Sequence, residues 1–235
     1  PYSFRCAPQV HGAVHESFVR LDEMLRTELN SATDNPLIFP NPSDPGAHEV
    51  VSQGNFHGEI VALTCDGMSL ALFELGSISE RRMDQMLDPG RSGLPAFLAT
   101  NSGLESGLMI VQYVAGSSLA ELHGQATPRT AFSTSTSAGQ EDHVSMGATS
   151  AWNLVKGVER LSEVLACELL IACEALEHAS LPTSAHVQGL YDLVRTLSPQ
   201  LTGDRSTSSE LRLLSEAVSY THLRAHETRG NLVCR

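Results

Sequence analysis

The sequence predicts an all-α protein, a bundle of long helices with one short loop or hairpin segment. Apolar residues recur at spacings of three or four over most of the chain, the period of a helix with one buried face. The only strand signal lies within residues 36–53, and no repeat of about 20 to 50 residues indicates a solenoid. The 235 residues are enough for one large domain.

The first predicted helix covers residues 11–32. Its apolar positions are Val14, Phe18, Leu21, Leu25 and Leu29. Pro36 ends this pattern, because proline disfavours helical geometry in the residue before it. Two short apolar runs, residues 37–39 and 50–51, flank a proline-rich loop and are expected to pair as a small hairpin.

The same period predicts five further helices. They are expected at residues 55–86, 103–122, from the end of the Thr127–Ser137 loop to about His178, 184–197 and 207–218. The helix that follows the Thr127–Ser137 loop, the fourth helix of the chain, should begin with a capping box formed by Ser137 and Gln140. Glu141 and Asp142 would then lie in its first turn, where the helix dipole favours acidic groups.

Residues 219–235 differ from the rest in composition. This segment has no apolar period and carries three arginines against one glutamate, whereas the whole chain has 15 basic and 27 acidic residues. It is similar to the adapter-like tails of reading frames assembled from short sequencing reads. We therefore treat residues 219–235 as a suspect non-native tail and expect the native C-terminus to be absent. The start at Pro1, inside a dense polar run, likewise suggests a fragment.

Composition excludes several classes of function. A formal net charge of −12 argues against nucleic acid as a partner, since that binding requires clustered Lys and Arg. No stretch approaches about 18 consecutive apolar residues, so no membrane association is expected. The five cysteines are scattered without CxxC spacing, which fits a reducing cytoplasm better than a disulfide framework.

Motifs for common cofactors are also missing. No serine hydrolase elbow, P-loop or dinucleotide-binding glycine pattern occurs, so no nucleotide is expected. His11 and His15 have the i, i+4 spacing of two metal ligands on one helix face, but no third ligand is identifiable. The sequence therefore predicts no metal.

Three places carry candidate binding chemistry. Arg5, close to Tyr2, could bind a carboxylate through its planar fork, or simply pair with a surface acid. Phe56 and His57 lie in a glycine-rich loop that opens a helix, where Phe56 could equally be an ordinary core residue. The run Gln140–His143 packs four hydrogen-bonding groups together, although helix capping alone would explain its charges.

Five ordered motifs resemble the aromatic amino-acid ammonia-lyase family, and the last of them resembles its histidine branch. They are PYSFRCAPQVHGAV (1–14), ELNSATDNPLIF (28–39), GNFHGE (54–59), SERRM (79–83) and QEDHVSMG (140–147). The resemblance runs to about Val218. It identifies residues 1–218 as similar to the C-terminal half of the ammonia-lyase fold.

The resemblance implies elimination of ammonia from L-histidine to give trans-urocanate in histidine catabolism, in a cytoplasmic homotetramer whose active sites are shared between subunits. The implied cofactor is a methylidene-imidazolone (MIO) made from an internal Ala-Ser-Gly. That tripeptide does not occur in this chain. In the family it lies upstream, together with a catalytic loop tyrosine, so we expect the chain alone to be inactive.

The resemblance also implies roles for individual residues. Tyr2 would line the cofactor, Arg5 would bind the substrate carboxylate, and Phe56 would pack against the substrate ring or the cofactor. Gln140 would contact the substrate and Glu141 would face its imidazole and amino group. Tyr2 and Glu141 are therefore the predicted catalytic residues, and Arg5, Phe56 and Gln140 the predicted substrate-binding residues.

Some positions depart from the family pattern. Gly139 replaces the usual Asn before the QEDH run, Glu121-Leu122-His123 replaces a frequent Glu-Asn-Lys, and the loop of residues 39–53 is longer than expected. Two alternatives therefore stay open. One is a tyrosine or phenylalanine lyase or an aminomutase, and the other is a non-catalytic helical assembly protein.

Overall fold

The computed structural model describes residues 1–44, 46–179 and 182–227, and within this part the chain is mostly helical. Its elements are α1 (Tyr2–Arg5), α2 (Ala7–Glu28), β1 (Leu37–Pro40), β2 (His48–Val51), α3 (Glu59–Leu87), α4 (Pro89–Ser92), η1 (Ala96–Leu98), α5 (Met109–Gln125), η2 (Ser137–Gly139), α6 (Gly147–Ala179), α7 (Ala185–Leu197) and α8 (Ser208–Glu227). The all-α prediction is confirmed.

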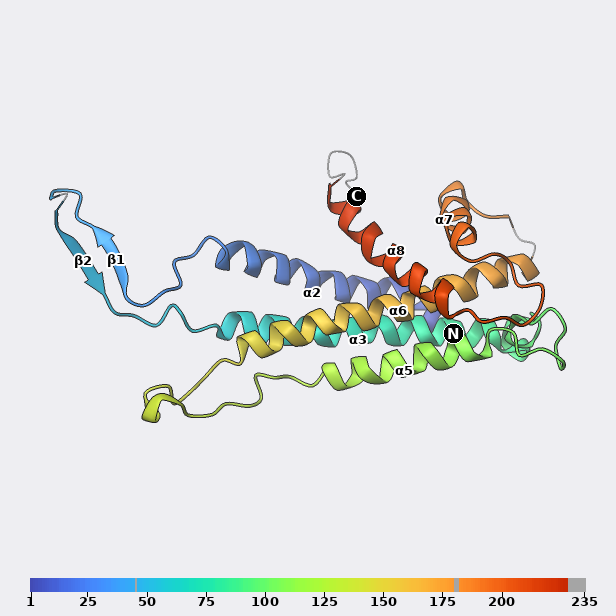
Figure 1. Cartoon of the computed structure of the whole chain (residues 1–235), viewed down its shortest axis with the longest axis horizontal. Coiled ribbons are helices and arrows are strands. Elements are labelled where there is room, and N and C mark those ends of the chain that lie inside the picture. The colour runs from blue at the N-terminus through green and yellow to red at the C-terminus, as the bar shows by residue number, and fades with distance from the viewer. Residues whose placement is uncertain (45, 180–181, 228–235) are drawn as a thin grey trace.

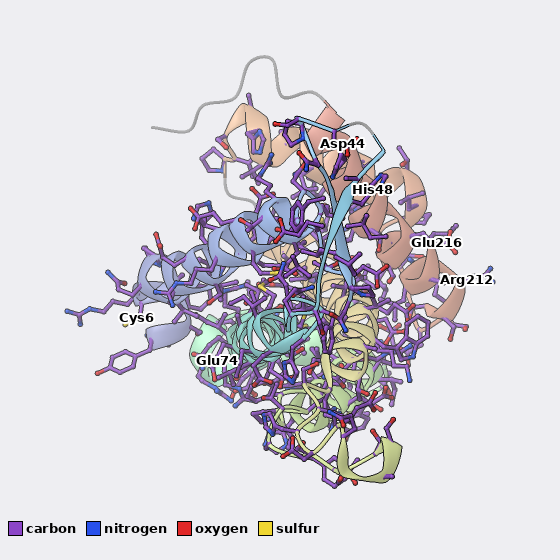
Figure 2. The ribbon with its side chains drawn as sticks, turned by 90° about the vertical axis from the view of Figure 1, so that its left-hand side faces the viewer. Cys6, Asp44, His48, Glu74, Arg212 and Glu216 are labelled. Atoms are coloured by element: carbon purple, nitrogen blue, oxygen red, sulfur yellow. The ribbon has the colours of Figure 1, made fainter. Side chains whose placement is uncertain are left out.

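The long helices α2, α3, α5 and α6 lie side by side along the length of the molecule (Figure 1). The pair α3 and α6 forms its centre, and the end-on view in Figure 2 shows Cys6, beside α2, and Arg212 and Glu216 of α8 on opposite sides of it. The hairpin pairs β1 and β2 antiparallel, with Ile38 opposite Val50, as the sequence predicted.

The core lies where α3, α5 and α6 meet. Its fully buried side chains include Met83, Leu122, Val164, Leu170 and Ile171. A glycine permits this close packing, since a Cβ at Gly76 would lie 3.0 Å from the Leu122 side chain. The apolar period of the sequence thus corresponds to the buried faces of these helices.

Helix α3 also satisfies the length and composition criteria for a membrane span. Among the described residues it is the one helix that does so, with a mean hydropathy of 1.4 over its most apolar window, 44% of which is buried. It packs against α2, α5 and α6 along its length, as a core helix does.

Several predicted boundaries were wrong. Helix α2 covers Ala7–Glu28 instead of 11–32, and α5 begins at Met109 instead of residue 103, because Gly103 and Gly107 have positive φ angles of 94° and 54°. Helix α7 begins where predicted, since the Ser184 hydroxyl accepts a hydrogen bond from the Val187 amide at 3.3 Å.

The end of the chain is only partly described. Helix α8 continues from the predicted end at Val218 to Glu227, inside the segment interpreted above as a suspect non-native tail. Residues 228–235 lie outside the described residues. The assignment of residues 219–235 as a non-native tail stays a prediction.

Candidate functional site

Two loops far apart in the sequence meet at the end of the bundle where α3 and α6 begin. His57 precedes α3 and His143 precedes α6, and their rings stack with centroids 5.8 Å apart and planes 9° apart. Nε2 of His57 lies 3.0 Å from the His143 carbonyl oxygen. The backbones also approach closely, since a Cβ at Gly147 would lie 3.0 Å from the Gly58 carbonyl oxygen. The GNFHGE and QEDHVSMG motifs therefore form one surface.

Asp66 of α3 anchors the loop that leads to α6. This buried carboxylate accepts hydrogen bonds from the Thr130 amide at 2.9 Å and the Thr130 hydroxyl at 2.8 Å. Burial by itself raises the pKa of Asp66, but the hydrogen bonds from Thr130 and its neighbours outweigh burial and hold the pKa below its ordinary value. The carboxylate is therefore kept ionised, as an acceptor for the loop.

The predicted capping box at Ser137 and Gln140 is wrong. Ser137, Ala138 and Gly139 have φ angles of 50°, 55° and 86°, which no right-handed helical turn can contain. The loop closes through Thr136 and Glu141 instead. The amide of Thr136 donates to the Glu141 carbonyl at 3.0 Å, the Glu141 amide donates back at 3.3 Å, and the Thr136 hydroxyl bonds the carboxylate.

Helix α6 consequently begins at Gly147, well after the acidic run. Gln140, Glu141 and Asp142 lie in an exposed loop and not in the first turn of a helix, so the predicted dipole interaction is wrong. Phe56 is also exposed, at 55%, which excludes its role as a core residue within this chain. This end of the bundle thus presents an aromatic ring, an amide and two carboxylates to its surroundings.

Tyr2 and Arg5 lie on the short helix α1, which contacts α3. Tyr2 is 79% exposed, whereas Ser3 between them is buried. The Arg5 guanidinium is exposed and has no ion pair with any residue that the structure describes. The alternative role of Arg5, a pair with a surface acid, therefore finds no support in the fold.

A single chain does not bring Tyr2 and Arg5 close to the predicted site residues at the other end of the bundle. Helix α2 runs antiparallel to α3, with His11 near its start lying 3.5 Å from Arg82 near the end of α3 (Figure 1). The 22 residues of α2 span about 33 Å at about 1.5 Å per residue. Tyr2 and Arg5 are therefore separated by roughly the length of this helix from Phe56 and Glu141.

Sequence reasoning missed a group of three possible metal ligands. His57, Glu59 and His143 each place one ligand atom within 4.8 Å of the others. The pair considered from the sequence, His11 and His15, belongs to no group of three such ligands in the described part of the chain. The available signal was that His57 and His143 each stand in a loop opening a long helix.

Comparison with known proteins identifies the family. The profile described as "Aromatic amino acid lyase" matches residues 1–196. The chain belongs to the aromatic amino acid lyase family. It is 47% identical over 224 residues to a histidine ammonia-lyase of Deinococcus radiodurans, covering 95% of this chain and 42% of that protein. A histidine ammonia-lyase of Symbiobacterium thermophilum is 43% identical over 219 residues, with coverage of 93% and 42%.

Solved structures of this family share the fold. The histidine ammonia-lyase of Trypanosoma cruzi superimposes with a TM-score of 0.89 at 42% identity, covering 96% of this chain and 44% of that one. The tyrosine aminomutase of Streptomyces globisporus gives 0.90 at 34% identity, with coverage of 100% and 44%. The resemblance drawn from the five motifs is confirmed, and the chain spans about 42% of the length of the curated lyases reported above.

Proposed function

We propose that this chain forms the C-terminal part of a histidine ammonia-lyase, which eliminates ammonia from L-histidine to give trans-urocanate in histidine catabolism. The observation that carries the proposal is the 47% identity to a histidine ammonia-lyase over 95% of this chain. The QEDHVSM form of the last motif supports the histidine branch. Since the chain spans about 42% of that relative, the activity is assigned to the complete protein.

The residues of this chain bind and orient the substrate. The Arg5 guanidinium, exposed and without an ion pair among the described residues, suits the substrate carboxylate. The exposed Phe56 ring packs against the imidazole, and Gln140 contacts the substrate beside it. The Glu141 carboxylate stabilises positive charge on the imidazole or amino group.

The electrophile must come from elsewhere in the protein. The family cofactor, methylidene-imidazolone, supplies an electron sink for loss of the amino group, and Tyr2 would lie beside it. The residues of this chain do not fit its formation, because they include no Ala-Ser-Gly. The chain alone is therefore proposed to be inactive.

A site shared between subunits reconciles the geometry with this chemistry. Arg5 lies at one end of the bundle and Glu141 in the loop at the other end, separated by roughly the length of α2, about 33 Å, and no single amino acid spans such a separation. Large apolar side chains also remain exposed along the helices, including Leu63, Leu70, Ile110, Tyr113, Trp152 and Val155. We propose that further copies cover these faces in a cytoplasmic homotetramer and bring the two groups together.

The test is a substrate profile of the complete protein. Purified enzyme is supplied with L-histidine, L-tyrosine or L-phenylalanine, and the formation of urocanate or of the corresponding acrylates is followed by ultraviolet absorbance. The proposal requires urocanate as the main product, with none from the present chain alone. A preference for tyrosine or phenylalanine would overturn the histidine assignment.

An aminomutase is the second candidate, because a tyrosine aminomutase superimposes with a TM-score of 0.90. An aminomutase would return the ammonia to the neighbouring carbon, so chromatography of the same reactions would detect a β-amino acid. The third reading, a non-catalytic helical assembly protein, is favoured if the complete gene lacks Ala-Ser-Gly.

A further inference from the structure

The histidine–glutamate cluster, defined as His57, Glu59 and His143, joins the loop before α3 to the loop before α6. Nδ1 of His57 and Nε2 of His143 lie 4.0 Å and 3.9 Å from the same oxygen, Oε2 of Glu59. The three side chains are 34%, 39% and 66% exposed, so a small ion can reach them from solvent.

The hydrogen bond of His57 determines which nitrogen faces Glu59. A carbonyl oxygen can only accept, so Nε2 of His57, 3.0 Å from the His143 carbonyl, must carry the proton and donate it. In the neutral ring, Nδ1 then has a free lone pair directed toward the Glu59 carboxylate. Histidines that bind metals usually donate their second N–H to a carbonyl or carboxylate in this way.

Three possible ligand atoms therefore lie within 4.8 Å of one another, and at least Nδ1 of His57 and Oε2 of Glu59 offer electron pairs. The gap of 4.0 Å from Nδ1 of His57 to Oε2 of Glu59 exceeds hydrogen-bond distance, so no proton is shared directly between these atoms. A cation placed among the three ligand atoms would compensate the carboxylate charge and use the lone pair of His57 Nδ1, together with that of His143 Nε2 in the tautomer protonated at Nδ1. The arrangement is that of a ligand set rather than of a closed hydrogen-bond network.

We propose that His57, Glu59 and His143 bind a divalent transition-metal cation. Two imidazole nitrogens and one carboxylate oxygen are a known ligand set for Zn²⁺ in open sites, where water occupies the fourth position. Metal–ligand distances of about 2.0–2.2 Å would require the ligand atoms to approach to about 3.4 Å. The observed gaps to Oε2 of Glu59 are 4.0 and 3.9 Å, and all three ligand atoms lie within 4.8 Å of one another, so side-chain rotations would bring them to this distance.

The ligand type also selects the metal. Mg²⁺ and Ca²⁺ prefer oxygen ligands, whereas imidazole suits zinc and its neighbours in the periodic table. The bound ion would hold the two loops against each other and so position Phe56 and Glu141, which lie next to or near the ligands in sequence. This inference does not depend on the proposed lyase activity, and it departs from the absence of metal expected from the sequence.

The experiment is titration of the full chain, first freed of metal with a chelator, with Zn²⁺ in a calorimeter. We expect one binding event per chain, and His57→Ala and Glu59→Gln should each weaken it by at least about tenfold, as loss of even an indirect partner commonly does. Mg²⁺ at the same concentrations should produce no comparable heat. Circular dichroism confirms that each variant keeps its helical content.

The matched control is His186→Ala, since His186 is an exposed histidine on α7 outside any group of three possible ligands in the described chain. This variant should bind Zn²⁺ like the parent chain. The proposal is wrong if the parent chain binds no Zn²⁺, or if the substitutions of His57 and Glu59 leave the affinity at the level of the His186 variant. Neither result bears on urocanate formation by the complete enzyme.

Discussion

The charged groups inside the bundle and those at its two ends differ in how completely they are paired. Glu174 of α6 is 1% exposed and accepts hydrogen bonds from Arg195 at 3.0 Å and from the Leu201 amide at 3.3 Å. Arg5, by contrast, is exposed and has no such partner among the described residues. The buried carboxylate is thus satisfied within one chain, whereas the guanidinium proposed to bind the substrate is left available.

The comparison predicts the largest loss of stability for Glu174→Ala. Removing the carboxylate leaves the Leu201 amide without its acceptor and the half-buried Arg195 with Glu177, 3.2 Å away, as its remaining carboxylate partner among the described residues, so unfolding should become easier by about 3 kcal/mol. Urea denaturation followed by circular dichroism measures this change. The control is Glu216→Ala on the exposed side of α8 (Figure 2), which should have little effect. Equal losses would show that pairing inside the chain does not distinguish the two glutamates.

Arg5→Ala should impair catalysis and leave stability nearly unchanged, the reverse of the effect expected for Glu174→Ala. In the complete enzyme we expect a higher KM for L-histidine and lower turnover, with a loss of roughly 2–4 kcal/mol of transition-state binding if Arg5 holds the carboxylate. Stability should hardly change, because the side chain is exposed. Steady-state kinetics of urocanate formation measure the effect, with Arg26→Ala on α2 as the control arginine. Unchanged kinetics would remove Arg5 from the site.

Asp66→Ala tests a carboxylate that links the interior of the bundle with the candidate site at its end. The side chain is buried, and it also anchors the loop of that site. The unpaired Thr130 amide should reduce stability by about 1–3 kcal/mol. The control is Glu74→Ala, an exposed acid on the same helix (Figure 2).

The pH dependence sharpens this prediction. Because the pKa of Asp66 is lowered in the folded chain, its stabilisation is present above the unfolded pKa of about 3.9 and is lost as the pH falls from there through the lower pKa of the folded chain. Denaturation between about pH 2 and 5 should therefore show a shallower acid loss in Asp66→Ala than in the parent chain. Parallel curves would contradict the assignment.

The smallest expected effect compares two serines that both have the sequence context of a helix cap. Ser184→Ala removes the hydrogen bond to the Val187 amide and should reduce stability by about 1 kcal/mol. Ser137→Ala should have a smaller effect, because Ser137 lies in a left-handed turn and caps no helix. Thermal melting of both variants distinguishes these outcomes.

The sequence predicted helices better than it predicted their starts. The apolar period locates α2, α3, α6 and α7 because each buries one face, and two short apolar runs locate the hairpin. It failed at α6, where Ser137 and Ala138 adopt positive φ angles that are uncommon for residues other than glycine. No local pattern distinguishes this turn from a capping box.

The candidate site was predictable residue by residue but not as an arrangement. Motifs singled out Arg5, Phe56 and Glu141, yet their separation depends on how α2 packs against α3, which the sequence does not express locally. The contact of His57 with His143 depends on α3 and α6 beginning at the same end of the bundle. Both features are properties of the tertiary structure.

The hairpin of β1 and β2 projects beyond the ends of α2 and α3 (Figure 1). Limited proteolysis at this hairpin can therefore test whether packing alone holds α2 against α3. A protease that cleaves the turn between the strands would leave both helices whole, and the extensive α2–α3 packing would keep the two pieces together. Nicked protein should therefore run as one species on a sizing column but as two bands after denaturation. Separation on the column would show that the covalent link, and not the helix packing, joins the first helix to the rest.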